Sequence, residues 1–144
     1  MKIIAVLNTK GVHVITVRPE QSVREAIALL VEHNVGALVV TDEAERPVGI
    51  VSERDIIRAS ARTPDVFNQP IRQVMTKDVI VASPHDDLKS VAQTMTERRF
   101  RHLPVMDQGR LAGIVSIGDV VKAQLEEYEG EIHTLQTQIM EGRA

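Results

Sequence analysis

The chain has no cysteine and no tryptophan among its 144 residues. The lack of cysteine excludes disulfides, thiolate metal ligands and cysteine nucleophiles. The aromatic residues are only Phe67, Phe100 and Tyr128, so the sequence offers no series of rings on which a single-stranded nucleic acid would stack. The hydrophobic core must therefore be built from Val, Ile, Leu, Ala and Met.

Positive charge and long apolar runs are scarce as well. The formal net charge is -3, so no overall positive field attracts nucleic acid. No apolar run is long enough to span a bilayer. The first eight residues lack the apolar length and the small-residue cleavage site of a signal peptide. We therefore expect a cytoplasmic chain, and the absence of cysteine fits a reducing compartment.

The sequence also lacks the usual signatures of catalysis. Its five histidines are dispersed, and no two have the i, i+4 spacing of metal ligands on a helix. There is no P-loop, no GxGxxG motif and no serine nucleophile elbow. The adjacent acids Asp86 and Asp87 stand where a helix N-cap is expected, and we interpret them as a cap. The sequence therefore predicts a protein that is not an enzyme.

What the chain does contain is an internal repeat. Three motifs of the first half return in the same order in the second half. The pairs are Val14-Ile15-x-x-x-Pro19 with Val79-Ile80-x-x-x-Pro84, Leu38-x-Val40-x-Asp42 with Leu103-x-Val105-x-Asp107, and Gly49-Ile50-Val51-Ser52-x-x-Asp55 with Gly113-Ile114-Val115-Ser116-x-x-Asp119. The offset falls from 65 to 64 residues across the loop before Gly49, where a change in length is tolerated.

Each repeat predicts the order strand, helix, strand, strand, helix. In the first repeat we expect strands at 14–17, 38–41 and 48–52 and a helix at 53–59. Its other helix begins after Ser22, which forms a capping-box pattern with Glu25 and precedes an apolar face of Val23, Ala26, Ile27, Leu30 and Val31. In the second repeat we expect strands at 79–82, 103–106 and 111–116 and helices at 88–95 and from 117.

Each repeat is too small to bury a good core alone. We therefore predict an α+β fold of two βαββα repeats that pack about a pseudo-two-fold axis, followed by a long C-terminal helix. The corresponding units are 1–62, the first repeat with the N-terminal segment, 63–122, the second repeat with the linker, and 123–144, a helical extension. Pro64 and Pro70 mark the linker because proline stops a preceding helix.

The last predicted helix, 117–140, carries apolar residues at heptad spacing. We call this set the heptad seam: Val121, Leu125, Tyr128, Ile132, Leu135 and Ile139. Gly130 weakens the helix by about 1 kcal/mol relative to alanine, so the seam needs a partner to remain helical. The pattern favours self-association into a homodimer. The alternative is a helix that folds back onto its own domain.

Two copies of these motifs in this order resemble paired cystathionine-β-synthase-type (CBS) domains, the Bateman module, over roughly residues 14–122. The motif Glu-Arg-Asp in the first repeat and the motif Arg-His-Leu-Pro-Val in the other repeat resemble those of stand-alone bacterial nucleotide-binding CBS proteins. The resemblance implies clefts between the repeats that bind AMP, ADP, ATP, S-adenosylmethionine or NAD(H). It also implies dimerisation and the regulation of a partner protein.

We therefore expect a sensor of energy or redox state with AMP as its ligand and with NAD(H), ADP or ATP as the other candidates. The alternative is a structural dimerisation module whose clefts no longer bind a ligand. In the family pattern, Asp55 and Asp119 accept the ribose hydroxyls, and Ser52 and Ser116 contact sugar or phosphate. The competing interpretation is that the serines are plain N-caps and the acids favour the helix dipole.

Phosphate recognition needs cationic donors. Arg54, Arg58, Arg101 and His102 are the candidates, and Gly36 and Ala37 stand at the positions of Arg101 and His102 in the first repeat. The two clefts should therefore differ: we expect the cleft of Arg101 and His102 to hold the phosphate, and the other either to accept a ligand through backbone and ribose contacts alone or to stay empty. Adenine recognition falls to apolar residues that are equally suited to the core: Val14, Ile15, Ala37, Val79, Ile80 and Pro104. Lys10 and Thr76 precede the first strand of each repeat and are candidates to turn inward, with a solvated loop position as the alternative for Lys10.

Overall fold

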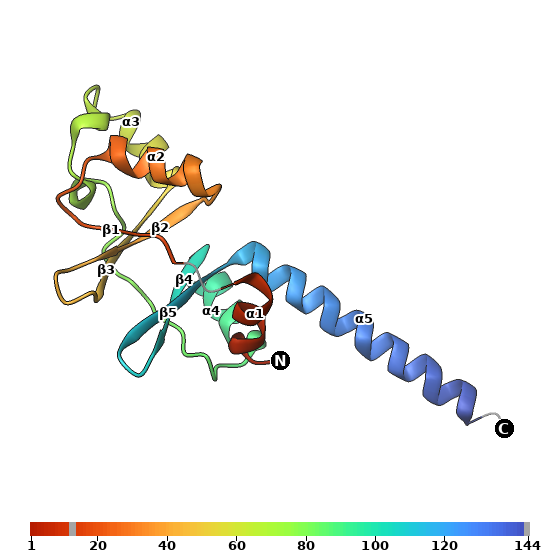
Figure 1. The fold of residues 1–144 in the computed structure, drawn as a ribbon. Coiled ribbons are helices and arrows are strands. Elements are labelled where there is room, and N and C mark those ends of the chain that lie inside the picture. The colour runs from red at the N-terminus through yellow and green to blue at the C-terminus, as the bar shows by residue number, and fades with distance from the viewer. Residues whose placement is uncertain (12–13, 143–144) are drawn as a thin grey trace.

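The two repeats appear as two small β-sheets, each packed against helices (Figure 1). The structure is a computed structural model that describes residues 1–11 and 14–142. Residues 12–13 and 143–144, which belong to the predicted first unit and the predicted extension, lie outside the described residues. The mixed arrangement of helices and strands, with a long helix at the C-terminal end, confirms the predicted α+β fold.

The first sheet has the strand order β1-β2-β3. Strand β1 (Thr16–Val17) runs parallel to β2 (Ala37–Thr41), which pairs antiparallel with β3 (Pro47–Ser52). All residues of β2 are buried, as expected for the central strand of a sheet covered by helices. Helix α2 (Val23–His33) joins β1 to β2, and α3 (Glu53–Ser60) follows β3.

The second sheet is a hairpin of β4 (His102–Asp107) and β5 (Arg110–Ser116). Helix α4 (Leu88–Arg98) precedes the hairpin, and α5 (Ile117–Glu141) follows it. The predicted strand 79–82 is wrong in extent because only Ala82 pairs with β4, through hydrogen bonds of 2.8 Å to Pro104 and from Met106. The predicted strand 14–17 is likewise reduced to the two residues of β1.

Each core is completed by a segment that comes from outside its own repeat motif. Helix α1 (Ile3–Lys10), which the sequence pattern does not predict, places Ile3, Val6 and Leu7 in the core of the second repeat. The connector between the repeats forms two short 3₁₀ helices, η1 (Val66–Asn68) and η2 (Ile71–Gln73), that contribute Val66 and Ile71 to the core of the first repeat. Both cores consist of Val, Ile, Leu, Ala and Met, as predicted.

The glycine of the repeated Gly-Ile-Val-Ser motif permits these segments to approach the sheets. A Cβ atom on Gly113 would lie 2.6 Å from Leu7 Cδ2, and a Cβ atom on Gly49 would lie 2.6 Å from Met75 Sδ. Both distances are shorter than a carbon or sulfur contact allows. The two glycines therefore hold equivalent positions, one beneath α1 and the other beneath the connector.

Two local predictions are wrong in detail. The predicted apolar face of α2 includes Val31, but this side chain is 75% exposed because it is rotated by about 100° around the helix from the buried Leu30. Asp87 occupies the N-cap position of α4 without capping it, since its carboxylate pairs instead with Lys2 Nζ at 2.8 Å. Asp86 accepts a hydrogen bond from the Ser83 amide at 2.8 Å.

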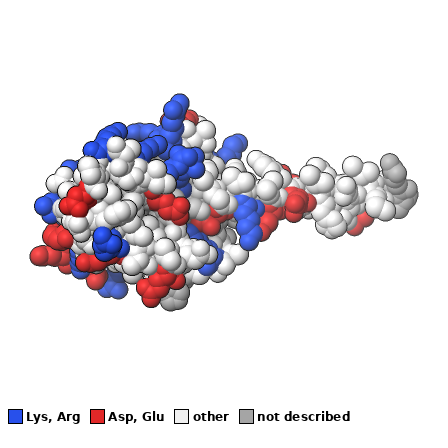
Figure 2. Space-filling view, turned by 90° about the horizontal axis from the view of Figure 1, so that it is seen from above, with Lys and Arg blue, Asp and Glu red and all other residues white. Residues whose placement is uncertain are grey.

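Helix α5 leaves the globular part of the protein soon after it begins. Val120 and Ala123 are buried in the second core, and the remainder projects as an arm (Figures 1 and 2). The residues of the heptad seam are between 46% and 57% exposed. The alternative in which this helix folds back onto its own domain is therefore wrong.

Candidate functional site

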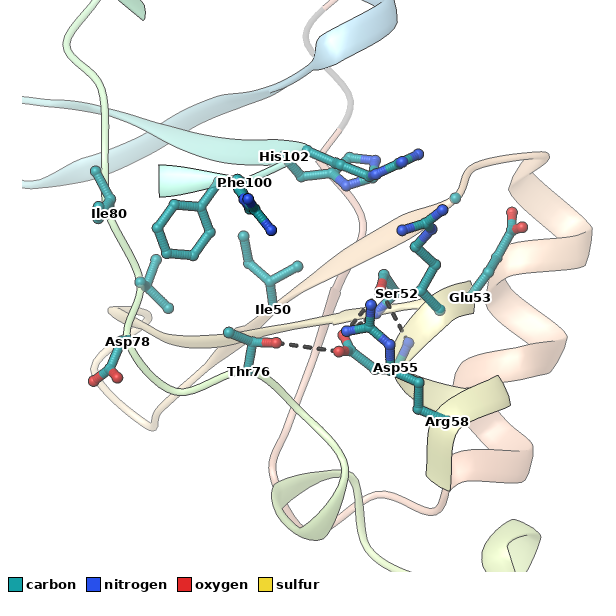
Figure 3. Close-up of a pocket in the computed structure, with 15 residues that line it drawn as sticks. Ile50, Ser52, Glu53, Asp55, Arg58, Thr76, Asp78, Ile80, Phe100 and His102 are labelled. Atoms are coloured by element: carbon teal, nitrogen blue, oxygen red, sulfur yellow. Dashed lines mark hydrogen bonds between the residues drawn. The ribbon is translucent and has the colours of Figure 1, made fainter. Parts of the chain in front are cut away.

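A cleft of about 280 Å³ lies between the two repeats (Figure 3). Its walls come from the start of α3, the end of β3, the connector after Thr76 and the segment that leads into β4. Of the residues predicted to bind a ligand, nine line this cleft: Ser52, Arg54, Asp55, Arg58, Thr76, Val79, Ile80, Arg101 and His102.

The carboxylate of Asp55 is fixed by the way α3 begins. The Ser52 hydroxyl accepts a hydrogen bond from the Asp55 amide at 3.2 Å. Asp55 Oδ2 in turn accepts from the Ser52 amide at 2.8 Å and from the Ser52 hydroxyl at 2.9 Å. Ser52 is thus the N-cap of α3 in a complete capping box, which the motif Ser-x-x-Asp encodes locally.

The second oxygen of this carboxylate is directed to the connector. Thr76 Oγ1 donates a hydrogen bond to Asp55 Oδ1 at 3.1 Å. The backbones of Thr76 and Ile50 also form a reciprocal pair of hydrogen bonds, at 2.8 and 3.0 Å. A carboxylate oxygen accepts two hydrogen bonds. Asp55 Oδ1 therefore retains one acceptor position for a hydroxyl group that enters the cleft.

Four arginines surround the same cleft: Arg54, Arg58, Arg99 and Arg101. All four are exposed, and within the described part of the chain none takes part in an ion pair. Their guanidinium groups are therefore available for a bound anion. The acids in the lining are Glu53 and Asp78 in addition to Asp55.

His102 stands between the cleft and the equivalent position in the second repeat. Burial lowers the pKa of its imidazole, and the nearby charges of Lys10 and Arg101 act in the same direction. The charges of Asp119 and Glu53 oppose this decrease in the pKa without reversing it. His102 is therefore neutral at neutral pH, so it adds no positive charge to the cleft.

The opposite end of the cleft is apolar. Ile50, Val79, Ile80 and Phe100 line it, and both Ile80 and Phe100 also pack against the core of the second repeat. Figure 3 shows Ile80 and Phe100 at one end and Ser52, Asp55 and Arg58 at the other. The cleft thus presents an apolar surface, a carboxylate and a group of guanidinium ions in one continuous space.

The equivalent acid of the second repeat has a different partner. Ser116 and Asp119 form the same capping box at the start of α5, with hydrogen bonds of 2.9 and 3.1 Å. Here, however, Lys10 Nζ lies 2.6 Å from Asp119 Oδ2 and 2.8 Å from the carbonyl oxygen of Ile114. Burial favours the protonated acid, but the hydrogen bonds from Lys10 and Ser116 outweigh it and lower the pKa of Asp119.

The structure does not bring the other predicted ligand residues to the cleft. Ala37 and Pro104 are buried in β2 and β4, and the half-buried Val14 and Ile15 are not part of its lining. The lining also contains residues that the sequence did not single out as ligand contacts: Gly36, Ile50, Glu53, Asp78, Arg99 and Phe100. Ile50 and Glu53 belong to the motifs Gly-Ile-Val-Ser and Glu-Arg-Asp, and Arg99 and Phe100 directly precede Arg101 and His102, so their place in the sequence was an available signal.

The comparisons identify the family. The CBS domain family model matches residues 7–62 and 71–126, so the chain belongs to the CBS-domain family and contains two tandem CBS domains. The CBS domain-containing protein YhcV of Bacillus subtilis is 34% identical over 84% of this chain and 86% of its own length. Among the described residues, no helix combines the length and apolarity that a membrane crossing requires, and no group of three or more His, Asp or Glu is arranged to hold a metal ion.

Solved structures show the same fold. The CBS-domain-containing protein ATU1752 from Agrobacterium tumefaciens has a TM-score of 0.82 and 42% identity, over 86% of this chain and 99% of that chain. The CBS domain pair of protein MJ0100, solved in complex with 5′-methylthioadenosine and S-adenosyl-L-methionine, has a TM-score of 0.79 and 28% identity, over 88% of this chain and 98% of that chain.

Proposed function

We propose that this chain binds an adenosine nucleotide in the cleft between its repeats and acts as a regulatory module rather than as an enzyme. The observation that carries the proposal is the order of chemical groups along the cleft. An apolar end, a carboxylate with a remaining acceptor position and four guanidinium groups match adenine, ribose and phosphate in turn. The ligands of the MJ0100 domain pair, both adenosine derivatives, support this assignment.

Each part of the nucleotide has a stated partner in this proposal. The vicinal ribose hydroxyls donate to Asp55 beside the Thr76 hydroxyl. The phosphate accepts charge-assisted hydrogen bonds from Arg58 and Arg101. The adenine ring packs between the side chains of Ile80 and Phe100, since a flat aromatic base gains most from contact with apolar and aromatic groups.

The dimensions of the cleft favour AMP over the larger candidates. Ligand pockets typically enclose about 300–1,000 Å³, and this cleft, at about 280 Å³, lies just below that range. The arginines favour a ligand with a phosphate over adenosine alone. NAD(H), ADP and ATP remain the other candidates. We propose that the bound nucleotide reports energy or redox state to a partner protein in the cytoplasm.

A melting screen with AMP, ADP, ATP, NADH and S-adenosylmethionine tests binding, because a ligand of the folded state raises the melting temperature by mass action. Calorimetry with AMP and adenosine then tests the phosphate contact. A lost charged hydrogen bond costs about 1.5–3 kcal/mol. Arg101→Ala should therefore weaken AMP binding about tenfold or more and leave adenosine unchanged.

Arg110→Ala is the matched control because Arg110 is an exposed arginine of β5 outside the cleft lining, and it should change neither ligand. An equal loss of AMP and adenosine affinity in Arg101→Ala would show that Arg101 is structural. If no nucleotide shifts the melting temperature, the chain is instead a structural dimerisation module.

We also propose that the chain forms a homodimer through α5. The heptad seam is exposed along the arm, and its spacing matches a second helix with the same repeat. In a fully overlapping antiparallel pair, Glu129 would face Glu129 of the second copy, and Glu131 would face Glu131 of the second copy. A parallel pair places Glu131 beside Gln136 and Gln124 beside Glu129, and this arrangement avoids both like-charge contacts.

The absence of cysteine from the chain makes the orientation directly measurable. Ile132 lies on the seam, and Ile132→Cys in the full chain should form a disulfide-linked dimer under oxidation if the helices are parallel. Thr134→Cys, on the outer side of the same helix, should not. A monomeric mass by light scattering would refute the proposed dimer, and equal cross-linking of the two variants would refute the parallel orientation.

A further inference from the structure

The two repeats hold their equivalent acids in different ways. In the first repeat, the carbonyl of Ile50 accepts from the Thr76 amide at 2.8 Å, and Asp55 accepts from the Thr76 hydroxyl at 3.1 Å. In the second repeat, the carbonyl of Ile114 and the carboxylate of Asp119 both accept from one group, the ammonium of Lys10. A single charged side chain thus replaces a backbone amide and a neutral hydroxyl.

This ammonium is an effective competitor for a nucleoside. The side chains of Lys10 and Asp119 are only 34% and 25% exposed, so solvent screens their ion pair less than it would on an open surface. Hydrogen bonds between charged groups are about twice as strong as neutral ones. A ribose hydroxyl, which is a neutral donor, would have to displace the ammonium from both Asp119 and the Ile114 carbonyl.

The position beside Asp119 that is equivalent to the described cleft, called here the second cleft, also lacks the groups that would offset this displacement. Gly118 stands at the repeat position of Arg54, and Gly36 stands at the position of Arg101. Only Lys122, at the position of Arg58, retains a positive charge. A phosphate would therefore gain much less in this cleft than in the first, and binding there would depend on the nucleoside contacts that Lys10 now blocks.

We infer that Lys10 closes the second cleft to nucleosides, so that each chain binds one nucleotide, and that Lys10 is the residue that sets this stoichiometry. The inference rests on the proposed function of the first cleft. Under this inference, the Asp119 carboxylate can bind a ribose only when the Lys10 ammonium is removed.

Calorimetric titration of the full-length chain with adenosine tests the inference, because adenosine does not need a phosphate site. Lys10→Met keeps the length of the side chain and removes its charge and its donors. Lys2→Met is the matched control, since Lys2 lies in the same N-terminal segment but pairs with Asp87 away from the cleft. We expect one adenosine per chain for the wild type and Lys2→Met and two for Lys10→Met, returning to one in Lys10→Met/Asp119→Ala.

Each other outcome has a distinct meaning. Two sites in the wild type, or one site in Lys10→Met, would overturn the inference and leave the first cleft in place. No binding of either adenosine or AMP to the wild type would refute the proposed function itself. Melting curves establish that the variants are folded, and Lys10→Ala must open the same second site if the ammonium is what closes it.

Discussion

The two acids that complete the capping boxes provide a matched pair of mutations. Asp55 and Asp119 each accept a hydrogen bond from the backbone of the serine three residues earlier, at 2.8 and 2.9 Å. Substitution by alanine removes this contact in both cases but leaves the N-cap serines in place, and the loss of an acid from the first turn of a helix costs about 0.3–1 kcal/mol. Asp119→Ala also loses the ion pair with Lys10, which adds up to about 1 kcal/mol for a partly exposed pair.

Both variants should therefore be less stable than the wild type, but they should differ from each other in their affinity for AMP. Only Asp55 lines the cleft. Its charge-assisted contact with the ribose is worth about 1.5–3 kcal/mol, so Asp55→Ala should weaken AMP binding about 10- to 150-fold. Asp119→Ala should leave the AMP affinity of the first cleft unchanged, although it also destabilises the protein.

Urea unfolding of the ligand-free proteins gives the change in the free energy of unfolding, and calorimetry with AMP gives the change in AMP affinity. The proposed ribose contact is refuted if Asp55→Ala retains the wild-type affinity. It is also refuted if the two variants lose affinity equally, because the loss would then follow from damage to the helix starts and not from a ribose contact.

Three further outcomes follow from packing and titration. Gly113→Ala should lower the free energy of unfolding in urea by about 1–3 kcal/mol, because the new methyl group would overlap Leu7; an unchanged value would contradict the packing of α1 on β5. The pKa of Asp119 is lowered from its ordinary value of 3.8, so the ionised carboxylate stabilises the fold at pH values above 3.8. This contribution is lost as the pH falls through the lower pKa of the folded state. Lys10→Met should therefore flatten the acid limb of stability against pH, and an unchanged limb would exclude the ion pair. The pKa of His102 is lowered from 6.5, so the free energy of unfolding should decrease as the pH falls below about 6.5, and His102→Gln should reduce that slope; an identical slope would place the titration elsewhere.

The repeated site motif was predictable because its structure is local. A serine before a helix and an acid three residues later form a capping box within one turn. The sequence therefore predicts the starts of α3 and α5 correctly, and the repeat shows that Ser52 with Asp55 and Ser116 with Asp119 are equivalent. Both serines are N-caps, as the competing interpretation holds. This role still leaves one acceptor position of the Asp55 carboxylate for a ligand.

Helix α1 was not predictable in the same way. The run from Ile3 to Leu7 has no capping residue before it, since Lys2 makes no side-chain cap, and it shows no alternation that distinguishes helix from strand. Its helical form depends on packing against a core whose other residues come from the second repeat. The orientation of Lys10 depends on that packing too, because its partner Asp119 is 109 residues away.

The first strands of the repeats were predicted too long for a related reason. Val79 and Ile80 have the β-branched character of a strand, but they line the cleft and only Ala82 reaches β4. A propensity for extended structure does not specify whether a neighbouring strand is within hydrogen-bonding reach.

The central claim is that the cleft between the repeats binds an adenosine nucleotide, and a crystal structure of the full-length chain grown with excess AMP tests it most directly. We predict one AMP per chain, with the ribose hydroxyls within hydrogen-bonding distance of Asp55, the phosphate beside Arg101 and the adenine against Phe100. An empty cleft at saturating AMP, or AMP bound only elsewhere on the chain, would contradict this claim.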